Sequence, residues 1–242
     1  MASHISSSLR TPVLLEVIAT TVDDARLAER GGADRIELIT AFGEGGLTPS
    51  VGLIEAVVNA VSIPVNVMVR PHSRSFVYGQ DDYRVMTRDV HAVVAAGANG
   101  VVTGMLDAAG EVDAEGLRRL IDAAEGRDVT FHRAFDEAAD LPRALDVLMS
   151  VDGVSSVLTS GGASSVLMAV EMMRTLMSRA EGSGVTVLAG AGLTIDAVGA
   201  FVDAAGVRAV HFGSGVRGGA GAGVDADKVK LVRAALDLRG RH

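Results

Sequence analysis

The stretch VTFHRAFD at residues 129–136 begins as an apolar strand pattern and ends in three side chains that can do chemistry. His132, Arg133 and Asp136 supply a titratable imidazole, a permanent cation and a carboxylate. Burying an uncompensated charge is costly, so such groups at a strand end must be paired, solvated or used. The stretch therefore indicates either a functional site or a salt-bridge network.

A second stretch, VNVMVRPH at residues 65–72, predicts a common direction for several polar groups. Side chains alternate along a strand, so Val65, Val67 and Val69 are expected to face outward. The residues between and after them are then expected to face inward: Asn66, Met68, Arg70 and His72. In the other apolar runs, the same alternation turns inward Glu16, Glu37, Thr103, His132 and His211.

This inward set fits two kinds of chemistry. In the first, Glu16 or Glu37 is a general base and His132 a general acid, with Asp136 as a further catalytic carboxylate. In the second, a metal ion of the Cu(II) or Zn(II) type is bound by imidazole and carboxylate ligands. The candidate ligands are Glu16, Glu37, His132 and His211. A structural ion-pair network is a third interpretation, in which breaking one buried pair is strongly destabilising.

Two glycine-rich segments, AGAG at 189–192 and FGSG at 212–215, follow the last two apolar runs. Glycine lets backbone N–H groups approach an anion closely, and phosphate-binding barrels place such loops at these positions. Together with Arg70 and Arg133, the segments predict a small anionic ligand, with four glycines in contact with it: Gly190, Gly192, Gly213 and Gly215. The alternative is that these glycines only form tight turns.

The elements that must position these groups alternate along the chain. Short apolar runs begin each of eight repeats, at 13–19, 35–39, 64–70, 100–104, 129–133, 154–160, 185–190 and 207–212. Longer stretches at helical spacing separate them, which predicts one α/β domain, a single (β/α)8 TIM barrel. We expect a flexible tail at residues 1–12, a barrel domain at residues 13–242, and an active site at the C-terminal ends of the strands.

Composition excludes several classes of function. The chain has no cysteine, which excludes disulfides and thiolate ligands, and the C-terminal position of its two lysines, Lys228 and Lys230, argues against Schiff-base chemistry. A net charge of −8 argues against nucleic acid and anionic membranes as partners. No signal peptide or membrane-length apolar run is present, so we expect a cytoplasmic protein with a small anionic ligand or a metal ion as partner.

Several motifs resemble those of the copper homeostasis protein CutC family: LLEV, GADRIEL, EGGLTPS, VTG, FHRAFD, LTSGG and AGAG, over about residues 13–238. The resemblance implies a single TIM barrel, a cytosolic location, an association with copper tolerance, and self-association as a homo-oligomer. Carried over by motif, it implies these site residues: Glu16, Glu37, Arg70, His132, Arg133, Asp136, Thr159 and His211.

The chain also departs from this family. Relatives often carry cysteines after the first-strand glutamate and near the second strand, where this sequence has LLEVIATT and IELITAFGEGG. Copper is thus the cofactor that the resemblance implies. This chain, however, lacks the soft cysteine ligands that copper(I) prefers. The loop RPHSRSFVYGQ differs from the family's glycine-rich version, so the resemblance does not extend to His72. The functional hypothesis is a role in copper homeostasis. The alternative is an isomerase, lyase or aldolase-like enzyme without a Schiff base, acting on a small phosphorylated or carboxylated substrate.

Overall fold

The computed structural model describes residues 12–219 and 221–239, which form the closed barrel predicted from the sequence. Within these residues, eight parallel strands pair in sequence order and β8 returns to pair with β1. The strands are β1 (Leu14–Ala19), β2 (Arg35–Leu38), β3 (Val65–Met68), β4 (Gly100–Thr103), β5 (Asp128–Phe131), β6 (Val154–Thr159), β7 (Thr186–Ala189) and β8 (Ala209–Phe212). The predicted (β/α)8 fold is confirmed, whereas the predicted tail lies almost wholly outside the described residues.

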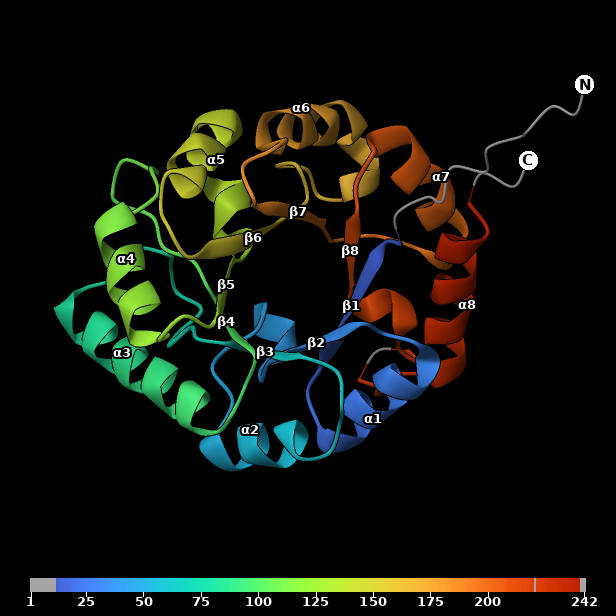
Figure 1. The fold of residues 1–242 in the computed structure, drawn as a ribbon, viewed down its shortest axis with the longest axis horizontal. Helices are drawn as coiled ribbons and strands as arrows, with labels where there is room; N and C mark the ends of the chain where they lie inside the picture. The colour runs from blue at the N-terminus through green and yellow to red at the C-terminus, as the bar shows by residue number, and fades with distance from the viewer. Residues whose placement is uncertain (1–11, 220, 240–242) are drawn as a thin grey trace, which may run out of the picture.

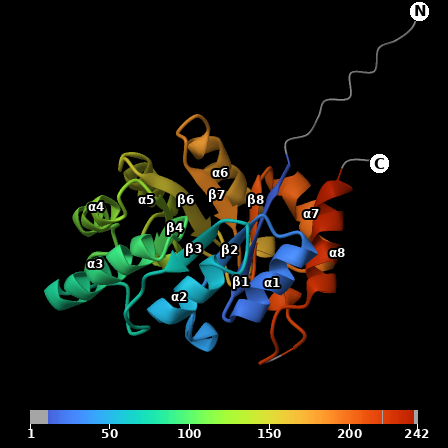
Figure 2. The same ribbon diagram turned by 60° about the horizontal axis from the view of Figure 1, so that its bottom comes forward.

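An α-helix follows each strand in the described part of the chain, and Figure 1 shows these helices as a ring around the strands. They are α1 (Val22–Gly31), α2 (Val51–Val58), α3 (Gln80–Ala95), α4 (Ala114–Ala123), α5 (Leu141–Met149), α6 (Val170–Ala180), α7 (Ile195–Ala205) and α8 (Ala226–Asp237). Figure 2 shows α3 and α8 on opposite outer sides of the barrel. None of the described helices is long and apolar enough to cross a bilayer.

Local sequence sets where these helices begin and end. The hydroxyl of Thr21 accepts a hydrogen bond from the Asp24 N–H and so caps the start of α1. Gly32 ends the same helix with a φ of 92°, a left-handed conformation that glycine adopts without strain. Asp140 caps α5, and a proline in the first turn fits a position that needs no N–H donor.

The main apolar core lies between the strands and the helices, and Val65, Val67 and Val69 belong to it as the alternation predicts. Two smaller clusters occupy the inner face of the barrel. One contains Met68 with Ile18, Ile39 and Val102, and the other contains Leu14, Leu158, Leu188 and Ala209. The polar side chains of the inner face therefore lie beside small apolar clusters and are shielded from water.

Short 3-10 turns after four of the strands carry residues of the barrel mouth. They are η1 (Phe42–Glu44) after β2, η2 (Arg133–Glu137) after β5, η3 (Val166–Met168) after β6 and η4 (Ser214–Val216) after β8. They lie at the carboxyl ends of the strands, the face on which barrel enzymes place their sites. The fold thus brings segments separated by about 170 residues to one opening.

Candidate functional site

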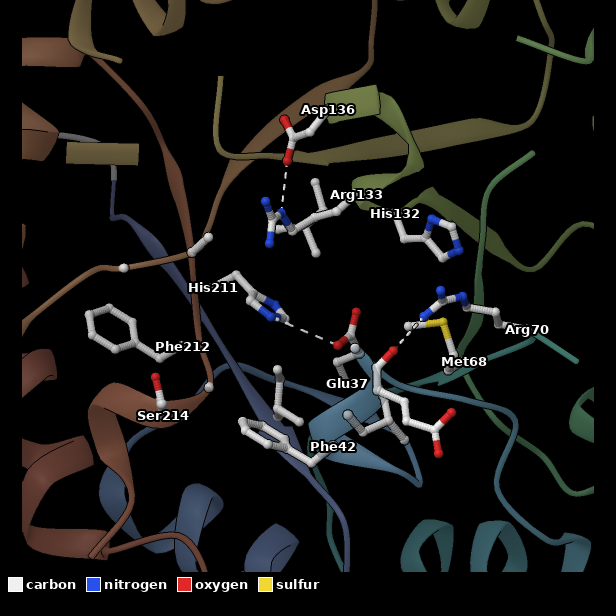
Figure 3. A pocket seen from close by; sticks show the side chains of 18 of the residues that line it. Glu37, Phe42, Met68, Arg70, His132, Arg133, Asp136, His211, Phe212 and Ser214 are labelled. Carbon is white, nitrogen blue, oxygen red and sulfur yellow. Dashed lines mark hydrogen bonds and ion pairs between the residues drawn. The ribbon is translucent and has the colours of Figure 1, made fainter. Parts of the chain in front are cut away.

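A cavity of about 420 Å³ opens at the carboxyl ends of the strands. Its lining includes ionisable side chains that Figure 3 labels: Glu37, Arg70, His132, Arg133, Asp136 and His211. Phe42, Phe76 and Phe212 add an apolar lining, and Met68 supplies the one sulfur atom among the described lining residues. A volume of this size suits a small organic molecule or a metal ion with additional small ligands.

Below the cavity floor, a hydrogen-bonded chain crosses three neighbouring strands. Glu16 of β1 is in register with His211 of β8 on one side and Arg35 of β2 on the other. Its Oε1 lies 2.7 Å from His211 Nδ1, and its Oε2 accepts from Arg35 Nε. Glu16 is fully buried and does not line the cavity, so both of its oxygens serve the protein rather than a ligand.

Glu37 stands at the end of this chain and faces the cavity. Its Oε2 lies 3.8 Å from His211 Nε2, and its buried Oε1 has no hydrogen-bond partner among the described residues. Burial raises the pKa of Glu37 to about 7, because the attraction of His211 and Arg35 does not offset burial and the repulsion from Glu16. This carboxyl group therefore changes its charge near neutral pH.

The charges on Glu16 and His211 stabilise each other. Burial opposes the charge on Glu16, but Arg35 and His211 outweigh it and lower its pKa. Burial likewise opposes a charge on His211, but Glu37 and Glu16 outweigh it and raise the pKa of the imidazole. Because Glu16 is a carboxylate, His211 Nδ1 donates to it. When His211 is neutral, its Nε2 therefore presents a lone pair towards Glu37 and the cavity.

The hydrogen bond at Nδ1 of His132 runs in the opposite direction to that of His211. His132 Nδ1 accepts a hydrogen bond of 3.1 Å from the Ala134 N–H at the start of η2, so the proton of the neutral ring is on Nε2. Burial and the nearby Arg70 lower the pKa of His132 to about 3, which keeps the ring neutral. A neutral ring that carries its proton on Nε2 offers no lone pair there for a metal ion. The structure therefore separates His132 from the predicted metal ligands, and the group within 4.8 Å comprises Glu16, Glu37 and His211.

Gly104 makes room for the His132 ring. A Cβ atom at this position would lie 2.4 Å from His132 Nδ1, a distance that no side chain can occupy. Replacing Gly104 would therefore push the imidazole away from the Ala134 N–H.

Arg70 connects the cavity wall to the loop after β2. Its Nη1 donates to the carbonyl oxygens of Glu44 at 3.0 Å and Gly46 at 3.1 Å, and its guanidinium stacks on Phe76 at 4.7 Å. The buried Nε has no acceptor among the described residues. Arg70 lies beyond the last residue of β3 but still faces the cavity, as the sequence predicts.

Asp136 organises the rim between β5 and β6. Its carboxylate accepts from Arg133 Nε at 2.8 Å, from the Thr159 hydroxyl, and from both the N–H and hydroxyl of Ser160. The Gly162 N–H also donates to it, at 3.2 Å. These bonds occupy both oxygens of Asp136, which holds the rim residues together and also lines the cavity. Thr159 lies behind the rim, whereas Arg133, 46% exposed, lines the cavity.

The four predicted anion-binding glycines are explained by packing. A Cβ atom on Gly190 would meet Leu158 and His211, and one on Gly213 would meet Ile18 and Phe42. Each added Cβ would lie within 3.0 Å of a protein atom, as would one on Gly192 or Gly215. Gly192, Gly213 and Gly215 still line the cavity, but Gly190 does not. Packing against neighbouring protein atoms is therefore sufficient to require glycine at these four positions.

The sequence prediction placed one residue wrongly, His72, and missed another, Arg35. His72, expected to face inward, lies in the loop after β3, where its Nε2 is 3.4 Å from Asp82 and its ring packs near Tyr78. Its placement was wrong because the alternation continues past the end of β3 only as far as Arg70, after which the loop sets the direction. Arg35, the partner of Glu16, was missed, although it lies two positions before Glu37 and must share its face.

Comparison with known proteins gives the same family as the motifs. The CutC family model matches residues 13–216. A family protein CutC of Agrobacterium fabrum is 40% identical over 200 residues, covering 83% of this chain and 78% of the relative. A family protein CutC of Xylella fastidiosa is 44% identical over 180 residues, covering 74% and 67%.

Among solved structures, the putative copper homeostasis protein CutC from Streptococcus agalactiae superposes with a TM-score of 0.78 at 26% identity. The match covers 83% of this chain and 98% of that one. The motifs, the family model and the curated relatives agree over most of the barrel, and the chain therefore belongs to the CutC family.

Proposed function

We propose that this protein takes part in copper homeostasis by binding a metal ion between Glu37 and His211. The role is the one that the Streptococcus agalactiae protein carries in its name, and it comes to this chain through family membership. The observation that carries the proposal is the pairing of Glu37 Oε2 with the oriented Nε2 of His211, in a carboxylate whose other oxygen, Oε1, has no partner among the described residues.

The residues present fit a borderline metal ion. Glu37 Oε2 and His211 Nε2 are 3.8 Å apart, and ligand bonds of about 2.0–2.2 Å would bridge that separation. Glu16 holds the other nitrogen of His211, an outer contact that metal-binding histidines usually have. Without cysteine, this oxygen and nitrogen pair suits Cu(II) or Zn(II) better than Cu(I), and Met68 lines the same cavity.

Glu37 and His211 would hold the ion, and Glu16 with Arg35 would keep His211 in place. A bound ion would supply Lewis acidity and open coordination positions facing the cavity. Two protein ligands are fewer than the four of a closed structural site, so the arrangement favours a metal ion that exchanges.

The proposal is tested by equilibrium dialysis of the purified protein against Cu(II) or Zn(II). We expect about one bound equivalent, and a loss of affinity of at least tenfold in Glu37→Gln and in His211→Gln. Binding should weaken as the pH falls below about 7, because protons on Glu37 and on His211, whose pKa is also raised, compete with the metal. His132→Gln is the matched control and should retain the metal. Retention below about a tenth of an equivalent by the wild type, in a site meant to bind stoichiometrically, would rule the proposal out.

A second candidate function, proton transfer by an enzyme, is supported by the pKa of about 7 for Glu37. A carboxylate with this pKa can remove a proton from a carbon next to a carbonyl group, with the electron pair moving onto the carbonyl oxygen, and then return the proton. The chelator-treated protein should then exchange deuterium from D2O into a small keto acid such as pyruvate. Glu37→Gln should lower that rate about a hundredfold or more. Equal exchange in wild type and variant would eliminate this candidate.

A further inference from the structure

Two buried N–H groups without acceptors lie on one wall of the cavity. They are Nε of Arg70 and Nε2 of His132, on residues 7% and 4% exposed. Both side chains pack on Phe76, with the guanidinium 4.7 Å and the imidazole 5.1 Å from its ring centre. A buried donor without an acceptor costs free energy, so a wall with two such donors indicates that a ligand supplies the acceptors.

The donor role of His132 is fixed by the backbone. The Ala134 N–H donates to Nδ1, so the proton of the neutral ring is on Nε2. Nε2 can therefore donate a hydrogen bond to a ligand but cannot accept one from it. Gly104 lets the ring lie in this position, because a Cβ atom there would lie 2.4 Å from Nδ1. Figure 3 places His132 and Arg70 together on one side of the cavity, with Glu37 and His211 below and across from them.

This wall carries one uncompensated positive charge, that of Arg70, which suits a ligand with a single negative charge. Arg70 donates to two carbonyl oxygens and forms no ion pair in the described part of the chain, so its positive charge is not compensated by a carboxylate. The phenol of Tyr78 interacts with Arg70 but does not compensate its charge, because burial raises the pKa of Tyr78 to about 12 and keeps it neutral. His132 is neutral, and Arg133 is already paired with Asp136. A phosphate dianion prefers more positive charge or a backbone cradle, and the glycines of the opposite loops are filled by protein atoms.

The rest of the cavity suits an apolar group. Phe42, Phe76, Leu193 and Phe212 line it together with Met68. A ligand with a carboxylate at one end and a small hydrocarbon or aromatic body at the other would satisfy both the donors and the lining.

We propose that Arg70 and His132 form a subsite for the carboxylate of a small organic acid with an apolar body. The subsite is formed by Arg70 and His132 and not by the proposed metal ligands, so it does not depend on the proposed metal function. Figure 3 shows His211 on the other side of the cavity and Glu37 between the two sides. The sequence predicts a ligand that is either phosphorylated or carboxylated, and this proposal selects the carboxylates.

The test uses metal-free protein treated with a chelator, so that loss of metal binding cannot affect the result. Calorimetry compares two matched pairs of probes, benzoate with phenylphosphonate and butanoate with propylphosphonate. The carboxylates should bind at least tenfold more tightly than their phosphonates. In protein labelled with 15N-histidine, benzoate should shift the Nε2–H resonance of His132, because a charged acceptor replaces an unsatisfied environment.

Variants of His132 separate a donor role from a packing role. His132→Gln keeps an N–H donor near the Nε2 position and should bind benzoate within about threefold of wild type. His132→Leu keeps the volume without the donor and should lose at least tenfold in affinity. Tighter binding of the phosphonates, an unmoved Nε2–H resonance, or equal affinities in the Gln and Leu variants would each overturn the proposal.

Discussion

Replacing Glu37 with Gln is expected to stabilise the protein by on the order of 3 kcal/mol near pH 8 and to change its stability little near pH 5. The folded-state pKa of Glu37 is raised from 4.5 to about 7. The protonated form therefore favours folding below the unfolded pKa, and this contribution is lost as the pH rises through about 7. Glutamine is neutral at both pH values, so the variant avoids that loss.

Urea denaturation at the two pH values measures this effect, read from the midpoint with an unchanged m-value. Glu137→Gln is the matched control, because Glu137 lines the same cavity but is exposed, and its replacement should change stability little. If Glu37→Gln were instead destabilising at both pH values, the Glu37 carboxylate would be part of a structural network and not held in the protein for a ligand.

Replacing Glu16 with Gln is expected to have the opposite effect and to cost about 3–5 kcal/mol at neutral pH. The change leaves the buried Arg35 without its carboxylate, and breaking one half of a buried pair is strongly destabilising. It also removes the acceptor that orients His211, so metal affinity should fall about 10- to 100-fold.

A double variant separates these two roles of Glu16. Glu16→Leu with Arg35→Met removes both buried charges and should recover much of the stability, because apolar residues often replace a buried ion pair without loss. It should not recover metal affinity, since His211 still lacks its acceptor. A Glu16→Gln variant as stable as wild type would show that the Arg35–Glu16 pair is not structural.

The pKa of Glu16 adds a pH dependence. Its folded-state pKa is lowered, so the stability from ionised Glu16 is present above its unfolded pKa and is lost as the pH falls through the folded one. The same loss should be absent from the apolar double variant. Acid titration of the midpoint in wild type and double variant would therefore identify this group directly.

Strand alternation predicted much of the site. It placed Glu16, Glu37, Met68 and His211 on the inner face, because each lies inside a strand where the direction of a side chain follows from its position. It failed for His72, which lies beyond the end of β3, where the path of the loop decides the direction. The same rule applied to β2 would have found Arg35.

The roles of the two histidines could not be predicted from their positions. The proton of His211 is set by a glutamate on a neighbouring strand, and that of His132 by a backbone N–H two residues further along the chain. Both partners are known only when the backbone path after each strand is known. The packing around the glycines could not be predicted for a similar reason. The atoms that a side chain would meet there, such as those of Leu158 beside Gly190, come from distant segments.

The bond between Glu16 and His211 joins positions 195 residues apart, across the seam where the first and last strands meet. During synthesis, β1 leaves the ribosome long before β8, so Glu16 can meet Arg35 early but lacks its His211 partner until nearly the whole chain has emerged. Contacts of such high sequence separation form late, because closing a long loop is entropically costly. The Glu37–His211 pair thus exists only in a chain whose barrel has closed, and metal uptake by nascent or truncated chains would report that closure.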